Sequence, residues 1–340
     1  MKNQSIALLV FSLLAFICDS PLRAADAYHP LGEIPMGGDG GWDYLTADSA
    51  AHRLYVTHAT KIVVIDTDHH TIVGEIEGLS GVHGFAVASK LGYGFATNGR
   101  DNNVSTIDLA TLKTVRKSTA GQNPDAVLFD PTRGEVYAFN GRSHSATIIA
   151  ASSGEVVATL PLAGKPEFCQ TDGTTTFVNL EDLNQVVAID QATHAISHSW
   201  PIAPGEEPTG LEIDLAHHRL FVGCGNAQLI VLNSNDGRFI ASVPAGKGID
   251  AVGFDPTTQM IFTSNGQDGT VTLIHEDSPD KYSVVQTLTT ERGARTLAVD
   301  PSSHRLYLTS AKFEAPVAGS NKRPALIPDS VKVLIYGPTK

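Results

Sequence analysis

A short β-forming segment that begins with an aromatic residue recurs seven times along the chain, at separations of 40 to 45 residues. Each copy follows an apolar stretch that ends in a polar turn, and runs rich in β-branched residues come after it. A fixed period of this length is typical of repeat architectures. The seven segments are Tyr55–His58, Phe95–Asn98, Tyr137–Asn140, Phe177–Leu180, Phe221–Cys224, Phe262–Asn265 and Tyr307–Ser310.

The pattern within each repeat predicts four short strands. In the third repeat, for example, Ala126–Phe129 precedes a turn at Asp130, and Glu155–Leu160 supplies the last strand. Apolar positions with helical spacing are missing, which excludes a helical solenoid. Four-stranded units with Gly, Asn, Asp and Pro at their joints match propeller blades. The sequence therefore predicts an all-β, seven-bladed β-propeller.

The last repeat offers no fourth strand after Val331–Tyr336. The segment His29–Met36 resembles the fourth-strand pattern of other repeats, such as Phe239–Pro244. We therefore expect residues 28–36 to complete the last blade, because shared closure removes a free sheet edge. Residues 28–340 then form a single propeller domain. Its last blade carries a long loop at 312–330, which we expect either to cover the channel mouth as a lid or to pack on the rim.

The repeated Tyr/Phe-x-Thr-Asn segment, with its Asn/Asp-Gly turns and Val-x-x-Ile-Asp strands, resembles the YVTN-repeat (YncE-like) β-propeller family over residues 28–336. The Trp-Asp and Gly-His marks of WD40 blades are missing. Leu180, Cys224 and Ser310 stand where the motif has Asn. The resemblance implies a seven-bladed fold in an exported protein. It implies binding or surface-layer roles more often than catalysis, and one branch is reported to bind DNA.

The N-terminus has the pattern of a secretory signal peptide. Lys2 precedes an apolar run from Ile6 to Ile17, and small residues follow at Ala24–Ala27. This run is shorter than the 18 or so residues of a spanning helix, so no stable membrane span is predicted. We expect residues 1–27 to be a signal peptide and the protein to be periplasmic or secreted. Beyond it, Cys169 and Cys224 fall in different blades, and spacing leaves their pairing open.

The composition changes the range of expected partners. The chain carries 24 basic and 36 acidic residues, a formal net charge of −12, and 42% of its residues are hydrophobic. A protein that binds nucleic acid non-specifically needs several Lys or Arg residues per site. The acidic balance therefore disfavours nucleic acid as a partner. We expect a monomer with a large apolar core.

Loops that join blades, and loops between second and third strands, emerge on one face of a propeller, where function is usually carried. Counting five residues back from the polar turn of each inner strand gives Asp43, Gly84, Asp125, Glu167, Thr209, Asp250 and Arg295, with His83 beside Gly84. The second-to-third-strand loops add His58, Arg100, Asp101, Arg142, His144, Glu181 and Asp268. We expect the first set to form a ligand site at the channel mouth and the second to supply its rim. The alternative is that each acid caps backbone N–H groups of the neighbouring blade.

The residue types at this channel mouth limit which metal ions could bind there, but they do not identify a cofactor. Carboxylates are compatible with a hard cation such as calcium, although the chain has no EF-hand loop. Zinc motifs such as His-x-His or His-Glu-x-x-His are missing from the sequence. The pairs His69-His70 and His217-His218 fall at turns, and we expect them to be solvated on the opposite face. No metal ligands are therefore assigned from sequence.

Three function classes follow from these patterns. The leading expectation is an exported binding or interaction propeller that recognises a small polar or cationic ligand, or a protein partner, on one face. The alternative is a propeller hydrolase or lactonase, with or without a metal ion, that uses His83 or His144 as a base. The third class, nucleic-acid binding, follows from the family resemblance and conflicts with the charge.

Overall fold

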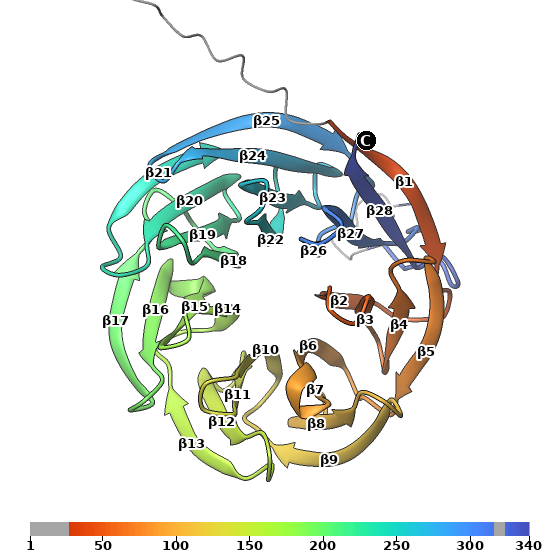
Figure 1. Cartoon of the computed structure of the whole chain (residues 1–340), viewed down its shortest axis with the longest axis vertical. Coiled ribbons are helices and arrows are strands. Elements are labelled where there is room, and N and C mark those ends of the chain that lie inside the picture. Colours follow the sequence, from red (N-terminus) through yellow and green to blue (C-terminus); the bar gives the residue numbers. More distant parts are fainter. Residues whose placement is uncertain (1–26, 316–323, 340) are drawn as a thin grey trace, which may run out of the picture.

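The computed structural model describes residues 27–315 and 324–339 of the chain. Over these residues the chain forms seven four-stranded antiparallel sheets around a central opening (Figure 1). The all-β, seven-bladed architecture expected from the repeats is confirmed. The helical elements of the described part are two short 3-10 turns, η1 (Ser89–Leu91) and η2 (Glu181–Leu183). Within the described residues, no helix has the length and hydrophobicity that crossing a membrane requires. The segment expected to be a signal peptide lies outside the described residues, except for its last position.

Each blade runs from an inner strand at the channel to an outer strand at the rim (Figure 1). The inner strands of blades 1 to 7 are β2 (Trp42–Asp48), β6 (Val82–Ala88), β10 (Pro124–Asp130), β14 (Pro166–Thr171), β18 (Pro208–Asp214), β22 (Ile249–Asp255) and β26 (Leu297–Asp300). The second strands are β3 (Arg53–His58), β7 (Tyr93–Asn98), β11 (Glu135–Asn140), β15 (Thr175–Leu180), β19 (Arg219–Cys224), β23 (Met260–Asn265) and β27 (Arg305–Ser310).

The two outer layers of each blade complete the sheets. The third strands are β4 (Lys61–Asp66), β8 (Asn103–Asp108), β12 (Ser145–Ala150), β16 (Gln185–Asp190), β20 (Gln228–Asn233), β24 (Thr270–Ser278) and β28 (Lys332–Pro338). The outer strands are β5 (Thr71–Glu77), β9 (Lys113–Thr119), β13 (Val156–Pro161), β17 (Ala195–Pro201), β21 (Phe239–Pro244), β25 (Lys281–Thr289) and β1 (Tyr28–Pro35).

The aromatic residue that opens each repeated segment is buried between two blades, with at most 3% of its surface exposed. Several of these rings contact an aromatic side chain on the inner strand of the next blade. The ring centroids of Tyr55 and Phe85 are 4.7 Å apart, and those of Phe221 and Phe254 are 5.1 Å apart. Such pairs stabilise the fold by about 0.5–1.5 kcal/mol beyond the burial of their area. The aromatic repeat thus marks the blade-to-blade core.

The Asn of the repeated segment holds a hairpin within its own blade. Asn98 Nδ2 donates hydrogen bonds to Asn103 Oδ1 at 2.8 Å and to Ser105 Oγ at 2.9 Å, both on β8. Asn140 and Asn265 bond in the same way to hydroxyl groups on the strand that follows. A buried amide needs such partners. In blades 4 and 5, where Leu180 and Cys224 replace Asn, buried apolar contacts fill this place instead.

The ring closes as expected, because β1 joins β26, β27 and β28 to complete blade 7. It pairs antiparallel with β28 from Tyr28 opposite Pro338 to Pro35 opposite Lys332. Ile34 on β1 is 5% exposed and belongs to the apolar cluster shared with blade 1. Segments from the two ends of the chain therefore share one sheet (Figure 1).

The long loop of the last blade is anchored at its base. Phe313 and Leu326 form an antiparallel bridge, and Ile327 N donates a hydrogen bond to Lys312 O at 2.9 Å. The Phe313 ring lies 6.3 Å from that of Trp42 at the start of blade 1. The base therefore packs across the joint between blades 7 and 1. Residues 316–323, at the tip expected to act as a lid or rim loop, lie outside the described residues.

Two alanine substitutions on β1 test whether this strand holds the ring shut. Ile34→Ala removes a buried side chain, so it should destabilise the fold by about 2–5 kcal/mol. For a chain of this size the melting temperature should fall by several degrees, at roughly 2–4 °C per kcal/mol. Leu31→Ala on the same strand, at a side chain 41% exposed, should shift it by about 1 °C or less. Equal shifts in thermal unfolding would contradict the closure.

Candidate functional site

Six of the seven inner strands carry a β-bulge near their first residue. In blade 1, Trp42 pairs with His58 and Leu45 with Val56, so Asp43 and Tyr44 lie opposite one residue of β3. The same register shift recurs in blades 2 to 6. A bulge adds a residue to one strand and re-aims the side chains there. The first bulge residues of blades 1 to 6 therefore occupy equivalent places at one end of the channel. Arg295 has the same place in blade 7, because it stands two residues before Leu297 as Asp43 stands two before Leu45.

These equivalent places define a set of side chains that we call the mouth ring. Its members are Asp43, His83, Asp125, Glu167, Thr209, Asp250 and Arg295. Gly84, which counting from the turn put in this set, is not a member. Ala88 pairs with Tyr93 as Asp48 pairs with Arg53, so the turn position in blade 2 is Ala88 and the count from Ser89 was one residue too far.

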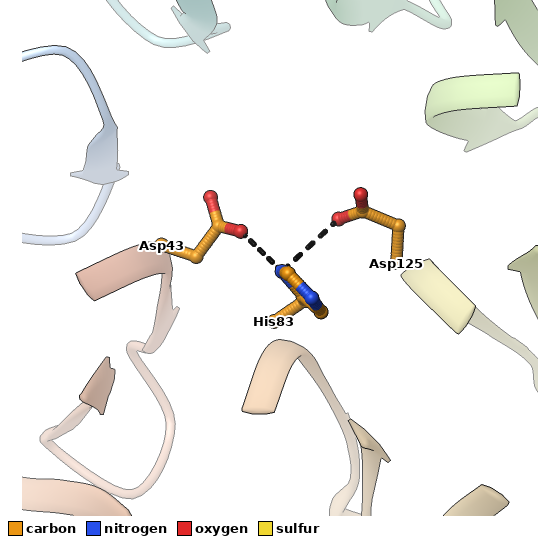
Figure 2. A group of neighbouring side chains, drawn as sticks. All are labelled: Asp43, His83 and Asp125. Carbon is orange, nitrogen blue, oxygen red and sulfur yellow. Dashed lines mark hydrogen bonds and ion pairs between the residues drawn. The ribbon is translucent and has the colours of Figure 1, made fainter. Parts of the chain in front are cut away.

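His83 lies between two carboxylates from the neighbouring blades (Figure 2). Its Nδ1 is 2.6 Å from Asp43 Oδ2 and 3.7 Å from Asp125 Oδ1. Burial alone would lower the pKa of His83, but the hydrogen bond to Asp43 and the charge of Asp125 outweigh it, so the pKa is raised. Burial, with the charge of Asp43, holds the pKa of Asp125 well above its usual range. His83 and Asp125 therefore keep their protons up to a higher pH than the same side chains would in water.

Arg295 extends this line of charges in the other direction. Its Nη1 is 2.6 Å from Asp250 Oδ2, its Nη2 is 3.6 Å from Asp43 Oδ1, and Nη2 donates to Trp42 O at 3.1 Å. Acidic and basic side chains thus alternate across blades 6, 7, 1, 2 and 3. Burial raises the pKa of Asp250 although Arg295 opposes it. The mutual repulsion expected of the acids is relieved by two cationic members of the ring.

Blades 4 and 5 complete the ring differently. Lys165 Nζ lies 2.9 Å from Glu167 Oε2 and also contacts Glu181. Burial raises the pKa of Glu167 to about 7, although Lys165 opposes the shift. Thr209 Oγ1 donates to Ile249 O at 2.8 Å and so ties blade 5 to blade 6. Sequence reasoning missed Lys165, whose only signal is its place two residues before Glu167.

A hollow of about 340 Å³ opens beside the ring over blades 4 to 7. Its polar lining includes three carboxylates, from Glu181, Glu207 and Asp250, together with Thr209 and Arg295. Glu207 is exposed in the turn before β18. It escaped the sequence reasoning because it belongs to a loop between blades rather than to a strand position. This hollow is small for a ligand pocket, and its lining is predominantly acidic.

Two aromatic side chains meet beneath the mouth ring. Tyr44 of blade 1 and Phe168 of blade 4 follow ring members in sequence, and their ring centroids are 5.0 Å apart across the channel. Both line a channel cavity of about 460 Å³, together with Glu212. Burial raises the pKa of Glu212 to about 7. The aromatic pair forms because the bulge re-aims the residue that follows each ring position. The sequence did not indicate this contact.

The residues expected at the rim divide into two groups. His58 is 1% exposed, and its Nδ1 lies 3.2 Å from Gly41 O, so it is not available to a ligand. Burial lowers the pKa of His58, consistent with a neutral, packed side chain. Arg100 and Arg142 are exposed, and His144 is half-buried. The correction at His58 arises because the loop before β2 folds over the end of β3.

The ring acids contact cationic side chains, and the blades are tied together by other groups. Among the described residues, carbonyl groups of ring members accept hydrogen bonds from the preceding blade, as from Thr97 to Asp125 and from Asn179 to Thr209. Ser264 likewise donates to the carbonyl of Arg295. The ring carboxylates are thus not the caps of backbone N–H groups that the alternative reading required.

Comparisons with known proteins support the fold and leave the family open. No family model and no curated protein matches the chain. Solved structures match it well. The WD40 repeats of RRP9 superpose with a TM-score of 0.75 and 12% identity, covering 93% of this chain and 99% of that one. Hydrazine synthase of Kuenenia stuttgartiensis superposes with a TM-score of 0.71 and 14% identity, covering 79% of this chain and 92% of that one. At these identities the likeness shows a β-propeller fold alone.

Two substitutions at the mouth ring test its electrostatics. Folding raises the pKa of Asp125, so proton binding by Asp125 stabilises the folded state. This stabilisation is complete below the pKa of the unfolded state and is lost as pH rises through the pKa of the folded state. Asp125→Asn should therefore gain stability relative to the parent protein as pH rises from 4 to 8. Asp43→Asn weakens the contacts with His83 and Arg295, and should cost about 1.5–3 kcal/mol at pH 7. Thermal unfolding measures the stability of both variants. If Asp125→Asn and the parent protein had the same dependence of stability on pH, the raised pKa of Asp125 would be refuted.

Proposed function

We propose that this chain is an exported, YVTN-type binding propeller that recognises a small cationic ligand at the mouth ring and the adjoining hollow. One observation carries the proposal, namely the surplus of carboxylates over cationic side chains gathered there. Six carboxylates face three cationic side chains: Asp43, Asp125, Glu167, Glu181, Glu207 and Asp250 against His83, Lys165 and Arg295. A positively charged group would neutralise part of that surplus.

The burial of these acids explains why a cation would bind and not only approach. Desolvation opposes the ionised form of Glu167 and Asp250, so part of their charge is withheld in the absence of a partner. An ammonium or guanidinium group within hydrogen-bond distance restores the ionised state and gains charge-assisted hydrogen bonds. The hollow of about 340 Å³ limits the ligand to a small molecule.

The position of His83 favours binding over hydrolysis. A general base must be unprotonated at the working pH, whereas Asp43 and Asp125 raise the pKa of His83 and stabilise its protonated form. Nucleic acid is disfavoured as a ligand for a related reason, because its phosphates would meet carboxylates at this mouth. A protein partner that presents a Lys or Arg side chain would use the same chemistry as a small amine.

Export and family membership rest on the sequence. The basic, apolar and small-residue order of residues 1–27 supports cleavage after export, and the recurring Tyr/Phe-x-Thr-Asn segments support the YVTN type. Expression of the full chain in a bacterial host, with periplasmic and cytoplasmic fractions analysed by intact mass, tests the export. The expected product is a periplasmic protein shortened by about 24–27 residues at its N-terminus. A full-length product confined to the cytoplasm would contradict it.

A titration with matched ligands tests the binding proposal. Small primary amines, diamines and guanidinium compounds should raise the melting temperature, whereas neutral amides of the same size and small carboxylates should not. Glu207→Gln removes one exposed carboxylate of the hollow, so it should weaken binding by roughly tenfold, the factor that about 1.4 kcal/mol represents. Isothermal titration calorimetry with the amine giving the largest shift measures this.

Glu77→Gln is the matched control, since Glu77 is an exposed carboxylate at the end of the outer strand β5. It should leave the affinity unchanged. Equal binding of amines and their neutral analogues, or equal weakening by Glu77→Gln and Glu207→Gln, would remove the support for a cation site at the mouth.

A further inference from the structure

A second group of ionisable side chains lies at the opposite end of the channel strands, between blades 5 and 6. Asp214 ends β18, whereas the mouth-ring residue Thr209 stands near its start. Asp214 meets His217 from the following turn and Glu276 from β24. His217 was expected to be a solvated turn residue, but its side chain is only 36% exposed and contacts both acids. Local sequence patterns do not reveal this contact, because Glu276 is 62 positions from Asp214.

The three side chains converge without satisfying one another. Their potential ligand atoms all lie within 4.8 Å of each other. His217 Nδ1 is 2.6 Å from Asp214 Oδ2 and 3.4 Å from Glu276 Oε1. Nevertheless Asp214 Oδ2, His217 Nδ1 and Glu276 Oε2 are buried atoms that make no hydrogen bond of acceptable geometry in the described structure. Asp214 and Glu276 are 2% and 3% exposed, so bulk solvent hardly reaches either carboxylate, and leaving such buried polar atoms unpaired is costly.

The nearest guanidinium group is occupied elsewhere. Arg219 pairs with Asp214 in the strand register, but its side chain donates to the carbonyl oxygens of His217, His218 and Pro279 and to Asp280. Besides its contact with His217, the Glu276 carboxylate accepts a long hydrogen bond of 3.4 Å from Tyr282 Oη. Burial, and then the charge of Asp214, raise the pKa of Glu276 to about 7. Two acids are thus held together with little compensating charge.

The joint between blades 3 and 4 fills the equivalent place with a different set of side chains. Strand register makes Asp130 equivalent to Asp214, Arg133 equivalent to His217, and Gln191 equivalent to Glu276. There Arg133 Nη1 lies 3.6 Å from Asp130 Oδ2. In the amide orientation that satisfies both its oxygen and its nitrogen, Gln191 donates to the same Asp130 oxygen at 3.2 Å. That joint is closed by one acid, one cation and one amide. At blades 5 and 6 all three residues are of metal-ligating type.

We propose that Asp214, His217 and Glu276 form a binding site for a divalent transition-metal ion such as Zn²⁺. One imidazole and two carboxylates are a donor set that zinc accepts, with water as the fourth ligand. In a tetrahedral site, ligand atoms are about 3.3 Å apart, given bonds of about 2.0–2.1 Å. The Glu276 to His217 separation already has this value, and the partly exposed His217 needs to move only slightly from Asp214. Calcium is disfavoured, because it takes six to eight oxygen ligands.

The site goes beyond the proposed ligand function, since it lies on the other face and shares no residue with the mouth ring. It joins the inner strand of blade 5 to the third strand of blade 6. A bound ion would therefore cross-link two blades near the end of their shared interface. We expect the ion to stabilise the fold, because a ligand that binds only the folded state raises the melting temperature.

Zinc binding to tag-free protein tests the proposal directly. The protein is dialysed against a chelator and then against metal-free buffer, and is titrated with ZnCl₂ by calorimetry and by thermal unfolding. One equivalent of Zn²⁺ should bind and raise the melting temperature. Glu276→Gln should weaken zinc binding by at least about 100-fold, since it removes a ligand and not only an outer contact. Glutamine stands at the equivalent Gln191, so this variant should fold.

Asp125→Asn is the control, because Asp43, His83 and Asp125 form the other group of metal-ligating residue types in the described structure. It should leave zinc affinity within about twofold of the parent protein. The double variant His217→Arg, Glu276→Gln recreates the joint of blades 3 and 4, and should melt at or above the zinc-free parent while binding no zinc. Absence of zinc binding by the parent protein would overturn the proposal. So would binding that is lost in Asp125→Asn and kept in Glu276→Gln.

Discussion

Every blade of this propeller must bury both of its faces, and this constraint governs the rest of the structure. A twisted four-stranded sheet with apolar residues on both sides is stable only when another sheet covers each side. The aromatic anchors Tyr55 and Phe221 meet the next blade's Phe85 and Phe254 for this reason. A linear stack would leave two uncovered faces, whereas the closed ring leaves none. The pairing of β1 with β28 is consequently a condition for the whole fold, because it completes the last blade.

The seven-fold register makes the same backbone position available seven times with different chemistry. The bulge in the inner strands turns Asp43, His83 and Asp125 toward one end of the channel, although they are 40 or more residues apart in sequence. Blade packing fixes where these side chains point and leaves their identity free. Charge has therefore accumulated at the mouth and, with other residues, at the opposite joint of blades 5 and 6. The proposed function at each place therefore depends on which side chains occupy backbone positions that are equivalent from blade to blade.

The sequence was a good guide to whatever the repeat imposes and a poor guide to contacts between repeats. The blade number, the shared last blade and six of the seven positions found by counting follow from periodicity. The error at Gly84 arose because Ala88 stands where the other counts start from a polar residue, so the count in blade 2 started one residue late, at Ser89. Lys165, Glu207 and the Tyr44–Phe168 pair escaped because they depend on loop paths and on contacts across the channel. The burial of His58 depends likewise on a loop from the preceding blade joint.

Tyr44 and Phe168 meet across the channel next to the mouth ring, with their ring centroids 5.0 Å apart. They line the channel cavity, whose walls include neither Asp214 nor Glu276. The cavity walls belong to strands that neighbouring blades hold in place, so residues 27–315 and 324–339 contain no movable element that would link the mouth ring to the joint of blades 5 and 6. Thermodynamic coupling requires such an element with two arrangements. A cation at the mouth and an ion at the joint of blades 5 and 6 should therefore bind with nearly independent free energies, as if on two separate proteins that share one scaffold.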